Sequence, residues 1–290
     1  MRRSFFASLV FLTTALMGSS FTIGKIGLAF ASPLLLAGVR FVLAGALMSL
    51  GVAVAKRPHP RTLSAWGGIA LIGLFQTAGV MGCIFVSLRT ITAAESSLIT
   101  FVNPLLVVLL SSLFLAQRYR PVQWAGVLLG FAGLSVTFGF HPRLQVGTWV
   151  ALTGALSWAV ATLLIHGIGR RYDVWVLTAY QMLFGGAALL ITSFALEVPR
   201  LLLNAASLSV LLWLAVMGSV VQFAIWFLLL QRGDPAKTSA FLFLVPLFGV
   251  FFGWLILHEK VDWHLALGGL LVLAGIFLVN WPKSPDQSIE

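Results

Sequence analysis

The sequence predicts an all-α membrane protein with ten transmembrane helices, arranged as two inverted five-helix repeats. Three observations lead to this fold. Hydrophobic residues make up 60% of the 290 residues and charged residues only 9%, whereas an ordinary soluble domain carries about 25% charged residues. Apolar runs follow one another along the chain, separated by short polar loops. Prolines and glycines of the first half recur in the second half at a nearly constant offset.

The apolar runs supply the expected helices. A helix needs about 20 mostly apolar residues to cross the hydrocarbon core, and it satisfies its backbone hydrogen bonds within one segment, as lipid requires. No run alternates strictly between apolar and polar residues, as a strand of a membrane barrel would. The first run exceeds the roughly 7–15 residues of a signal-peptide core, so we expect it to remain as a helix. The expected helices span residues 5–28, 33–55, 66–88, 94–116, 121–139, 146–168, 174–194, 208–230, 236–257 and 262–281.

Lysines and arginines are distributed unequally between the two sides of the predicted bundle. With a cytoplasmic N-terminus, that side carries twelve of them and the other side five, while Arg40 lies within a span. Positive residues are enriched in cytoplasmic loops, so we expect a protein of the cell inner (plasma) membrane with both termini cytoplasmic. The net charge of +10 therefore reflects the loops. We expect membrane lipid and a small-molecule substrate as partners, and no nucleic acid.

The two halves of the sequence match at an offset of 141–142 residues. We expect a first repeat at residues 1–140, a second at 141–282 and a polar cytoplasmic tail at 283–290. Because five helices per half is an odd number, the halves must lie in the membrane with opposite orientations. Inverted repeats are typical of secondary carriers, with the site near the midplane, although channels can also be built this way. The matched pairs are Pro104 with Pro246, Gly126 with Gly268, Gly133 with Gly275, Arg40 with Gln181, and Gly45 with Gly186.

Short motifs recur in order through both halves, and none is decisive alone. With this set the sequence resembles the drug/metabolite transporter superfamily, in its EamA-type family. The resemblance implies a ten-helix carrier, often an exporter of amino acids or related metabolites. Two departures are Met17, where Trp is usual, and Gln117, the first-half counterpart of Glu259. The motifs are Gly18-Ser19-Ser20-Phe21, Leu36-Ala37-Gly38-Val39-Arg40-Phe41, Asn103-Pro104-Leu105, Ala155-Leu156-Ser157-Trp158-Ala159, Val245-Pro246-Leu247 and Leu257-His258-Glu259-Lys260.

Polar and aromatic residues lie near the middle of five predicted spans. Polar side chains at this depth are costly, so they are candidates for a functional site. Amides with aromatic faces would suit a polar or zwitterionic ligand that has an apolar part. The alternative is hydrogen bonding between helices, worth about 0.6 kcal/mol on average. The predicted substrate-binding residues are Met17, Gln76, Asn103, Trp158, Gln222 and Trp226.

Two further sets of residues are candidates for conformational or electrostatic roles. Pro104 and Pro246 are expected to kink their helices, either as gating joints or as static bends. Lys25, Arg40 and Glu95 are expected near the non-cytoplasmic face. They would form either a vestibule that attracts an anion or a fixed network in which Arg40 snorkels or pairs with Glu95.

Gly126, Gly130 and Gly133 line one helical face. Small residues let helices approach closely, so we expect tight packing inside the bundle. The alternative is dimerisation through this face, and both a monomer and a homodimer remain open.

The sequence holds no motif for catalysis or for a cofactor. There is no His-Glu-x-x-His motif, no pair of aspartates within a span and no phosphate-binding loop. We therefore expect no catalytic residues, no metal site, no cofactor and no enzyme activity. The leading hypothesis is a secondary transporter that works by alternating access at a midplane cavity and exports amino acids or related small metabolites. The alternative is a passive facilitator or channel for small polar solutes.

Overall fold

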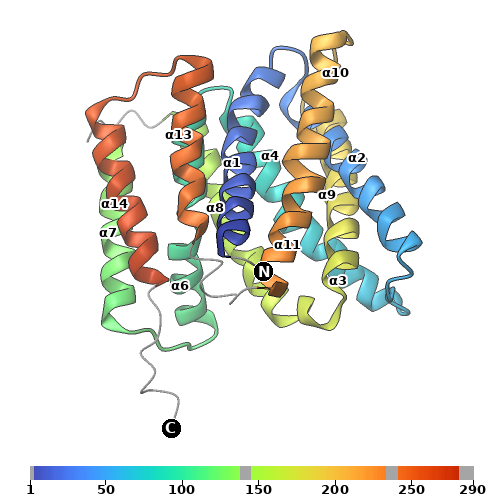
Figure 1. Ribbon diagram of the computed structural model, residues 1–290, viewed down its shortest axis with the longest axis horizontal. Helices are drawn as coiled ribbons and strands as arrows, with labels where there is room; N and C mark the ends of the chain where they lie inside the picture. The colour runs from blue at the N-terminus through green and yellow to red at the C-terminus, as the bar shows by residue number, and fades with distance from the viewer. Residues whose placement is uncertain (1–2, 138–144, 233–240, 281–290) are drawn as a thin grey trace.

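The computed structural model describes residues 3–137, 145–232 and 241–280, and this part of the chain is a bundle of helices (Figure 1). Extended pairing within it is limited to one bridge between Ala31 and Leu201. α1 begins and α14 ends at the same end of the bundle, the lower end in Figure 1. The expected tail at 283–290 lies outside the described residues.

Seven helical segments are long and apolar enough to cross a membrane. Four are α1 (Arg3–Gly27), α2 (Pro33–Val54), α8 (Val146–Gly167) and α9 (Val174–Leu196). Another joins α5 (Ala93–Thr100) to α6 (Asn103–Phe114). Each of the remaining two contains a π-helix. One consists of α3 (Leu63–Gly73), the π-helix η1 (Leu74–Gly79) and α4 (Val80–Ser87). The other consists of α10 (Ala205–Leu212), the π-helix η3 (Trp213–Val221) and α11 (Gln222–Arg232).

Three shorter apolar helical segments complete the bundle. They are α7 (Pro121–Thr137), the pair η4 (Phe241–Phe243) and α13 (Leu244–Leu257), and α14 (Trp263–Val279). A single 3-10 turn, η2 (Gly169–Arg171), follows α8. Each of these ten apolar segments overlaps one of the predicted apolar runs, so the prediction of an all-helical membrane protein is confirmed. Ten membrane crossings in two inverted repeats stays a prediction.

Local sequence signals set many of the helix ends. Pro33 and Pro104 lie in the first turns of α2 and α6, where a missing N–H costs nothing. Thr92 and Glu95 form a capping box at the start of α5. α5 ends at Thr100, so the predicted kink at Pro104 falls at the break between α5 and α6. Pro246 likewise lies in the first turn of α13, directly after η4.

Glycines hold two helix pairs in close contact. α7 packs along α14 at one edge of the bundle, and α2 packs along α9 at the other (Figure 1). A β-carbon on Gly126 would lie 2.7 Å from the carbonyl oxygen of Gly275. A β-carbon on Gly45 would lie 2.6 Å from the backbone nitrogen of Leu183. The predicted tight packing inside the bundle is therefore confirmed for α7.

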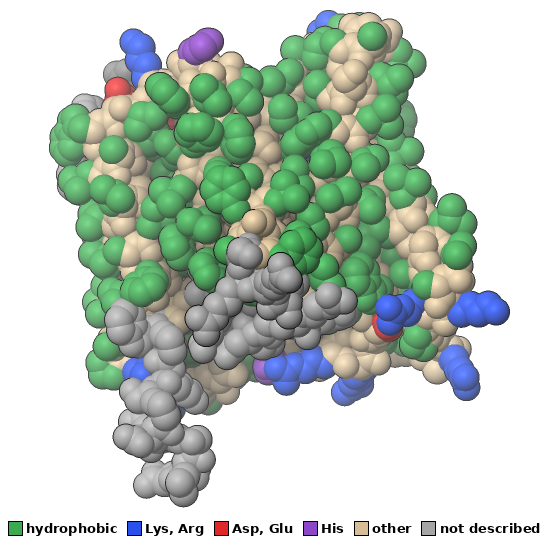
Figure 2. Space-filling model, viewed as in Figure 1, with side chains coloured by type: hydrophobic (Ala, Val, Ile, Leu, Met, Phe, Trp, Pro, Cys, Tyr) green, Lys and Arg blue, Asp and Glu red, His purple; other side chains and the backbone are tan. Residues whose placement is uncertain are grey.

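The outer surface of the bundle is apolar along its length. Hydrophobic side chains cover the face seen in Figure 2, while lysines and arginines gather at its two ends, more of them at the lower end. An exposed apolar surface of this extent is unfavourable in water and is what lipid solvates. Large exposed hydrophobic side chains include Leu128, Trp149, Phe194, Trp254 and Leu270.

Candidate functional site

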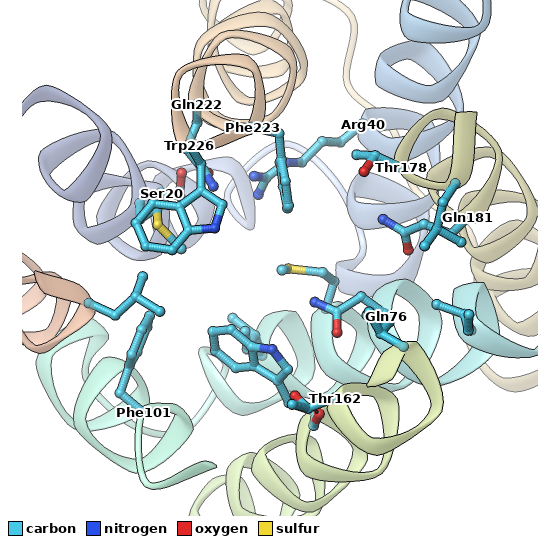
Figure 3. Close-up of a pocket in the computed structure, with 18 of the residues that line it drawn as sticks. Ser20, Arg40, Gln76, Phe101, Thr162, Thr178, Gln181, Gln222, Phe223 and Trp226 are labelled. Atoms are coloured by element: carbon cyan, nitrogen blue, oxygen red, sulfur yellow. Dashed lines mark hydrogen bonds between the residues drawn. The ribbon is translucent and has the colours of Figure 1, made fainter. Parts of the chain in front are cut away.

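A cavity of about 320 Å³ lies between the helices. Figure 3 shows its polar and aromatic side chains arranged around one opening. The volume is within the range of small-molecule sites, about 300–1,000 Å³. The polar lining residues are Ser20, Arg40, Gln76, Thr162, Thr178, Gln181 and Gln222. The aromatic ones are Phe21, Phe85, Phe101, Trp158, Phe223 and Trp226.

The structure brings most of the predicted substrate-binding residues to this cavity. The ones that line it are Met17, Gln76, Trp158, Gln222 and Trp226. Asn103 does not belong to the lining, although it is buried at the start of α6. The sequence identified these residues by their depth along the predicted spans. Only the packing of the helices showed which of them face the cavity.

Several lining residues were not singled out by the sequence. Thr178 and Gln181 lie on α9, and Phe101 lies at the break after α5. Gln181 could have been found from its match with Arg40 at an offset of 141 residues. Phe101 makes a T-shaped contact with Trp158, with ring centroids 5.1 Å apart.

Arg40 is a buried cation in the wall of the cavity, with 3% of the residue exposed. Its Nε donates a hydrogen bond of 3.0 Å to Oγ of Ser219, and its Nη2 donates one of 2.7 Å to the carbonyl oxygen of Gly218. Its Cζ lies 4.7 Å from the ring centroid of Phe41 and 5.9 Å from that of Phe85. Within the described residues no carboxylate contacts it. The snorkelling or Glu95 pairing considered from the sequence is therefore wrong for this structure.

The matched position on the other half makes a similar contact without a charge. Gln181 accepts, through Oε1, a 2.6 Å hydrogen bond from the hydroxyl of Thr77. Thr77 lies in the π-helix η1, as Ser219 lies in the π-helix η3. π-helical turns occur frequently at functional sites. Gln76 of η1 lines the cavity, whereas η3 contacts the lining residue Arg40. Each π-helix is thus held by a side chain from a neighbouring helix.

Gln76 offers the cavity a polar group that has no protein partner. Its Oε1 atom is buried, and no described residue donates a hydrogen bond to it. In Figure 3 its amide points toward the opening that Arg40 and Gln222 border from other helices. A buried acceptor without a donor is unfavourable, so an occupant of the cavity that donates a hydrogen bond here would be favoured.

An ion pair joins α1 to the loop after α13 at the upper end of the bundle. Lys25 Nζ lies 3.1 Å from Oε1 of Glu259 and donates 2.8 Å to the carbonyl oxygen of Ile91. Glu259 also accepts hydrogen bonds from the backbone nitrogens of Ala93 and Ala94, at 2.8 and 3.1 Å. A carboxylate at a helix N-terminus is stabilised by the helix dipole. Glu259 therefore ties α5 and α1 to the second half of the chain.

Lys25, Arg40 and Glu95 lie in three different settings. Lys25 contacts Glu259, and Arg40 contacts the π-helix η3. Glu95 accepts hydrogen bonds from the backbone nitrogen and the hydroxyl of Thr92, at 2.8 and 2.9 Å. The described contacts therefore do not join the three residues into one charged cluster.

A second contact closes the same end of the bundle. Ser32 donates from its backbone nitrogen to the carbonyl oxygen of Arg200 at 2.9 Å, and Leu202 donates to that of Phe30 at 2.8 Å. Glu197 accepts a 3.0 Å hydrogen bond from the backbone nitrogen of Leu35, in the first turn of α2. The loops that follow α1 and α9 are therefore hydrogen-bonded to each other.

The cavity extends toward the opposite end. Its lining reaches Ile165, near the last turn of α8, and Val174, the first residue of α9. At this end Arg57 and Asp173 form an ion pair of 3.6 Å. In the described part of the chain, no group of three or more histidines, cysteines or carboxylates could hold a metal ion. The site is thus a neutral and cationic cavity with aromatic walls.

Comparison with known proteins identifies a family and several relatives that are named transporters. The model of the EamA-like transporter family matches residues 4–139 and again residues 145–281. The chain is 30% identical over 275 residues to the uncharacterized transporter YvbV of Bacillus subtilis (strain 168), covering 93% of this chain and 89% of that protein. It is 30% identical over 282 residues to an uncharacterized transporter of Archaeoglobus fulgidus, covering 94% of this chain and 96% of that protein.

Two further comparisons extend this result. The chain is 28% identical over 277 residues to the uncharacterized inner membrane transporter YedA of Escherichia coli (strain K12), covering 92% of this chain and 87% of that protein. A solved structure titled "Crystal structure of protein" superposes with a TM-score of 0.67 at 22% identity, covering 96% of this chain and 97% of that chain; this likeness supports the fold. The apolar helices are those of a multi-pass membrane protein, and the chain belongs to the EamA-like transporter family.

Proposed function

We propose that the protein is a secondary transporter that exports amino acids or related small metabolites by alternating access. One observation carries the proposal: a mid-span cavity extends toward one end of the bundle, while contacts between loops and helices close the other end. A carrier of this kind exposes its site to one side at a time. The cavity, its polar lining and its aromatic walls fit a small metabolite.

The architecture proposed from the sequence has independent support. The family model matches the chain twice, close to the proposed repeats at 1–140 and 141–282. Helix pairs α2 with α9 and α7 with α14 each join one helix to its sequence-matched partner. Figure 2 supports the proposed orientation through the lysines and arginines at its lower end. The similarity to YedA, which is named an inner membrane transporter, supports a location in the inner membrane.

We propose that the substrate contacts the predicted residues that line the cavity. These are Met17, Gln76, Trp158, Gln222 and Trp226. Asn103 stays a prediction that the cavity lining does not support. Pro104 lies in the first turn of α6, just after the break that follows α5, and Pro246 lies in the first turn of α13, just after the 3-10 helix η4. We propose that these two breaks are the joints at which the segments move.

Counterflow in proteoliposomes tests the proposal. Vesicles with purified protein are loaded with a candidate amino acid or organic metabolite, and uptake of the same labelled compound is followed. A carrier gives saturable uptake that the internal compound stimulates. Flux that rises linearly with concentration and shows no counterflow would instead identify a passive facilitator or channel. The candidate compounds come from a growth screen, in which cells that overexpress the protein are tested for resistance to toxic amino acids.

A further inference from the structure

The cavity wall carries one formal positive charge and no negative charge among its described residues. The charge belongs to Arg40, whose contacts are the hydroxyl of Ser219, the carbonyl of Gly218 and the faces of Phe41 and Phe85. Each of these partners is neutral. A cation at membrane depth is costly and is normally paired or solvated. The lining therefore leaves the charge of Arg40 uncompensated.

Holding the π-helix does not explain this charge. The matched contact in the other half, from Thr77 to Gln181, holds the π-helix η1 with a neutral amide. A neutral side chain could hold η3 in the same way. A guanidinium has five N–H groups, and its hydrogen bonds to Ser219 and Gly218 use one on Nε and one on Nη2. The other N–H groups remain for an occupant of the cavity.

The rest of the lining sets the shape and polarity of that occupant. Phe21, Phe101, Trp158 and Trp226 supply apolar walls. The unpartnered Oε1 of Gln76 can accept one hydrogen bond. A cavity of about 320 Å³ accommodates a small metabolite rather than a long acyl chain.

We propose that the transported substrates are small amphipathic carboxylates and that Arg40 binds the carboxylate group. This inference rests on the proposed function, because it names the substrate class of the same cavity. A carboxylate accepts two parallel charge-assisted hydrogen bonds from a guanidinium. A cationic ligand would be repelled by Arg40, and the ammonium of a zwitterion would meet only amides and ring faces. The cavity thus favours a monoanion over a zwitterion with the same apolar part.

A matched series of probes tests the wild-type protein. Purified protein in nanodiscs is titrated calorimetrically with 3-phenylpropanoate, 3-phenylpropan-1-ol, 3-phenylpropylamine and phenylalanine, and with the 4-methylpentanoate series as a second skeleton. We expect the carboxylates to bind about 10- to 100-fold more tightly than the alcohols, the range for hydrogen bonds to charged groups. Palmitate distinguishes a lipid-derived carboxylate from a small metabolite, and we expect it not to compete.

Three variants separate the charge from the contact with η3. Arg40→Gln is expected to abolish the preference for carboxylates, whereas Arg40→Lys keeps the charge and is expected to retain part of it. Ser219→Ala removes the hydroxyl that Arg40 contacts but leaves the cation, so it is expected to keep the preference. If Arg40→Gln does not fold, the wild-type series and Ser219→Ala still decide the inference.

The outcomes separate this inference from the proposed function. The inference would be overturned if the wild-type protein bound carboxylates and alcohols with equal affinity, or bound no carboxylate at all. It would also be overturned if Arg40→Gln kept the wild-type preference for carboxylates. Competition by palmitate would also overturn it, in favour of a lipid-derived ligand. Counterflow of neutral or zwitterionic compounds without charge preference would leave the transporter standing and remove the anion site. Tight carboxylate binding without counterflow would support the anion site and contradict the proposed transport.

Discussion

Thr77 donates a hydrogen bond of 2.6 Å to Gln181, and the contact has a counterpart in the other half of the chain. There Arg40 donates one of 3.0 Å to Ser219. Thr77 precedes Ser219 by 142 residues, and Arg40 precedes Gln181 by 141. In both contacts the hydroxyl belongs to a π-helix and the partner to α9 or α2. The two halves of the chain thus fix equivalent irregular turns beside the same cavity.

Removing the hydroxyl of Thr77 tests the uncharged contact. Thr77→Val keeps the shape of the side chain but leaves Oε1 of Gln181 buried without its donor. We expect the free energy of unfolding to fall by about 0.6–2 kcal/mol, measured by denaturant titration in mixed micelles. Thr153→Val is the matched control, because Thr153 is exposed and, among the described residues, its hydroxyl donates to the carbonyl oxygen of Trp149 on its own helix. Equal losses in both variants would argue against a role of the contact.

Glu259 is expected to keep the upper end of the bundle closed. Glu259→Gln removes the charge that Lys25 and the N-terminus of α5 share. With Cys83 replaced by alanine and Ser20→Cys as reporter, we expect an impermeant thiol reagent to label the reporter faster from that side. A change of about 1.4 kcal/mol in the equilibrium between the closed and open states is tenfold. The labelling rate of the reporter should therefore rise by up to about tenfold.

The control for this measurement lies at the same helix start. Glu95→Gln changes a carboxylate whose described contacts are with Thr92 of its own capping box. It should leave the labelling rate of the reporter unchanged. A similar rise in Glu95→Gln and Glu259→Gln would mean that the reporter responds to loss of α5 rather than to opening between the halves.

Two glycines of α2 should respond in opposite ways to the same substitution. At Gly45 a β-carbon would lie 2.6 Å from the backbone nitrogen of Leu183 on α9, whereas at Gly51 it would meet nothing within 4 Å. We expect Gly45→Ala to lower the free energy of unfolding by about 1–3 kcal/mol through overpacking. Gly51→Ala should raise it by about 0.5–1 kcal/mol through helix propensity. Thermal unfolding followed by circular dichroism compares the two, and a loss of equal size at both positions would contradict the packing described.

Trp158 is expected to act on the substrate rather than on the fold. It lines the cavity and contacts Phe101, so Trp158→Ala removes an aromatic wall. We expect the half-saturation concentration for counterflow to rise about tenfold while the folded yield stays normal. An aromatic contact contributes about 0.5–1.5 kcal/mol beyond the burial of its area, and about 1.4 kcal/mol corresponds to a tenfold change in affinity. Trp149→Ala on the same helix is the control, because Trp149 is 57% exposed on the outer surface. An unchanged half-saturation in Trp158→Ala with a lower yield would make Trp158 a packing residue.

The sequence predicted the helices well because their signals are local. The run expected at 33–55 is α2, Pro33–Val54, and the run expected at 146–168 is α8, Val146–Gly167. Length and hydropathy decide whether a segment can be buried in lipid. Proline and capping residues decide where it begins. The π-helices carry no such signal, because their extra residue per turn depends on contacts with neighbouring helices.

The lining of the candidate cavity was predicted in part, for a similar reason. Depth along each span selected Met17, Gln76, Trp158, Gln222 and Trp226, all of which line the cavity. Depth alone cannot say which way a helix is turned, so the same rule also selected Asn103, which is not part of the lining.

By itself the sequence determined that this chain is helical, embedded in lipid and a member of a transporter family, because composition, run length and repeated motifs are properties of the chain in one dimension. Only the tertiary structure decided the partners of its charges. Lys25 meets Glu259 from 234 residues away, and Arg40 meets a π-helix instead of a carboxylate. Such pairings depend on how helices rotate and pack against one another, and the energy that selects them arises only when the bundle has formed.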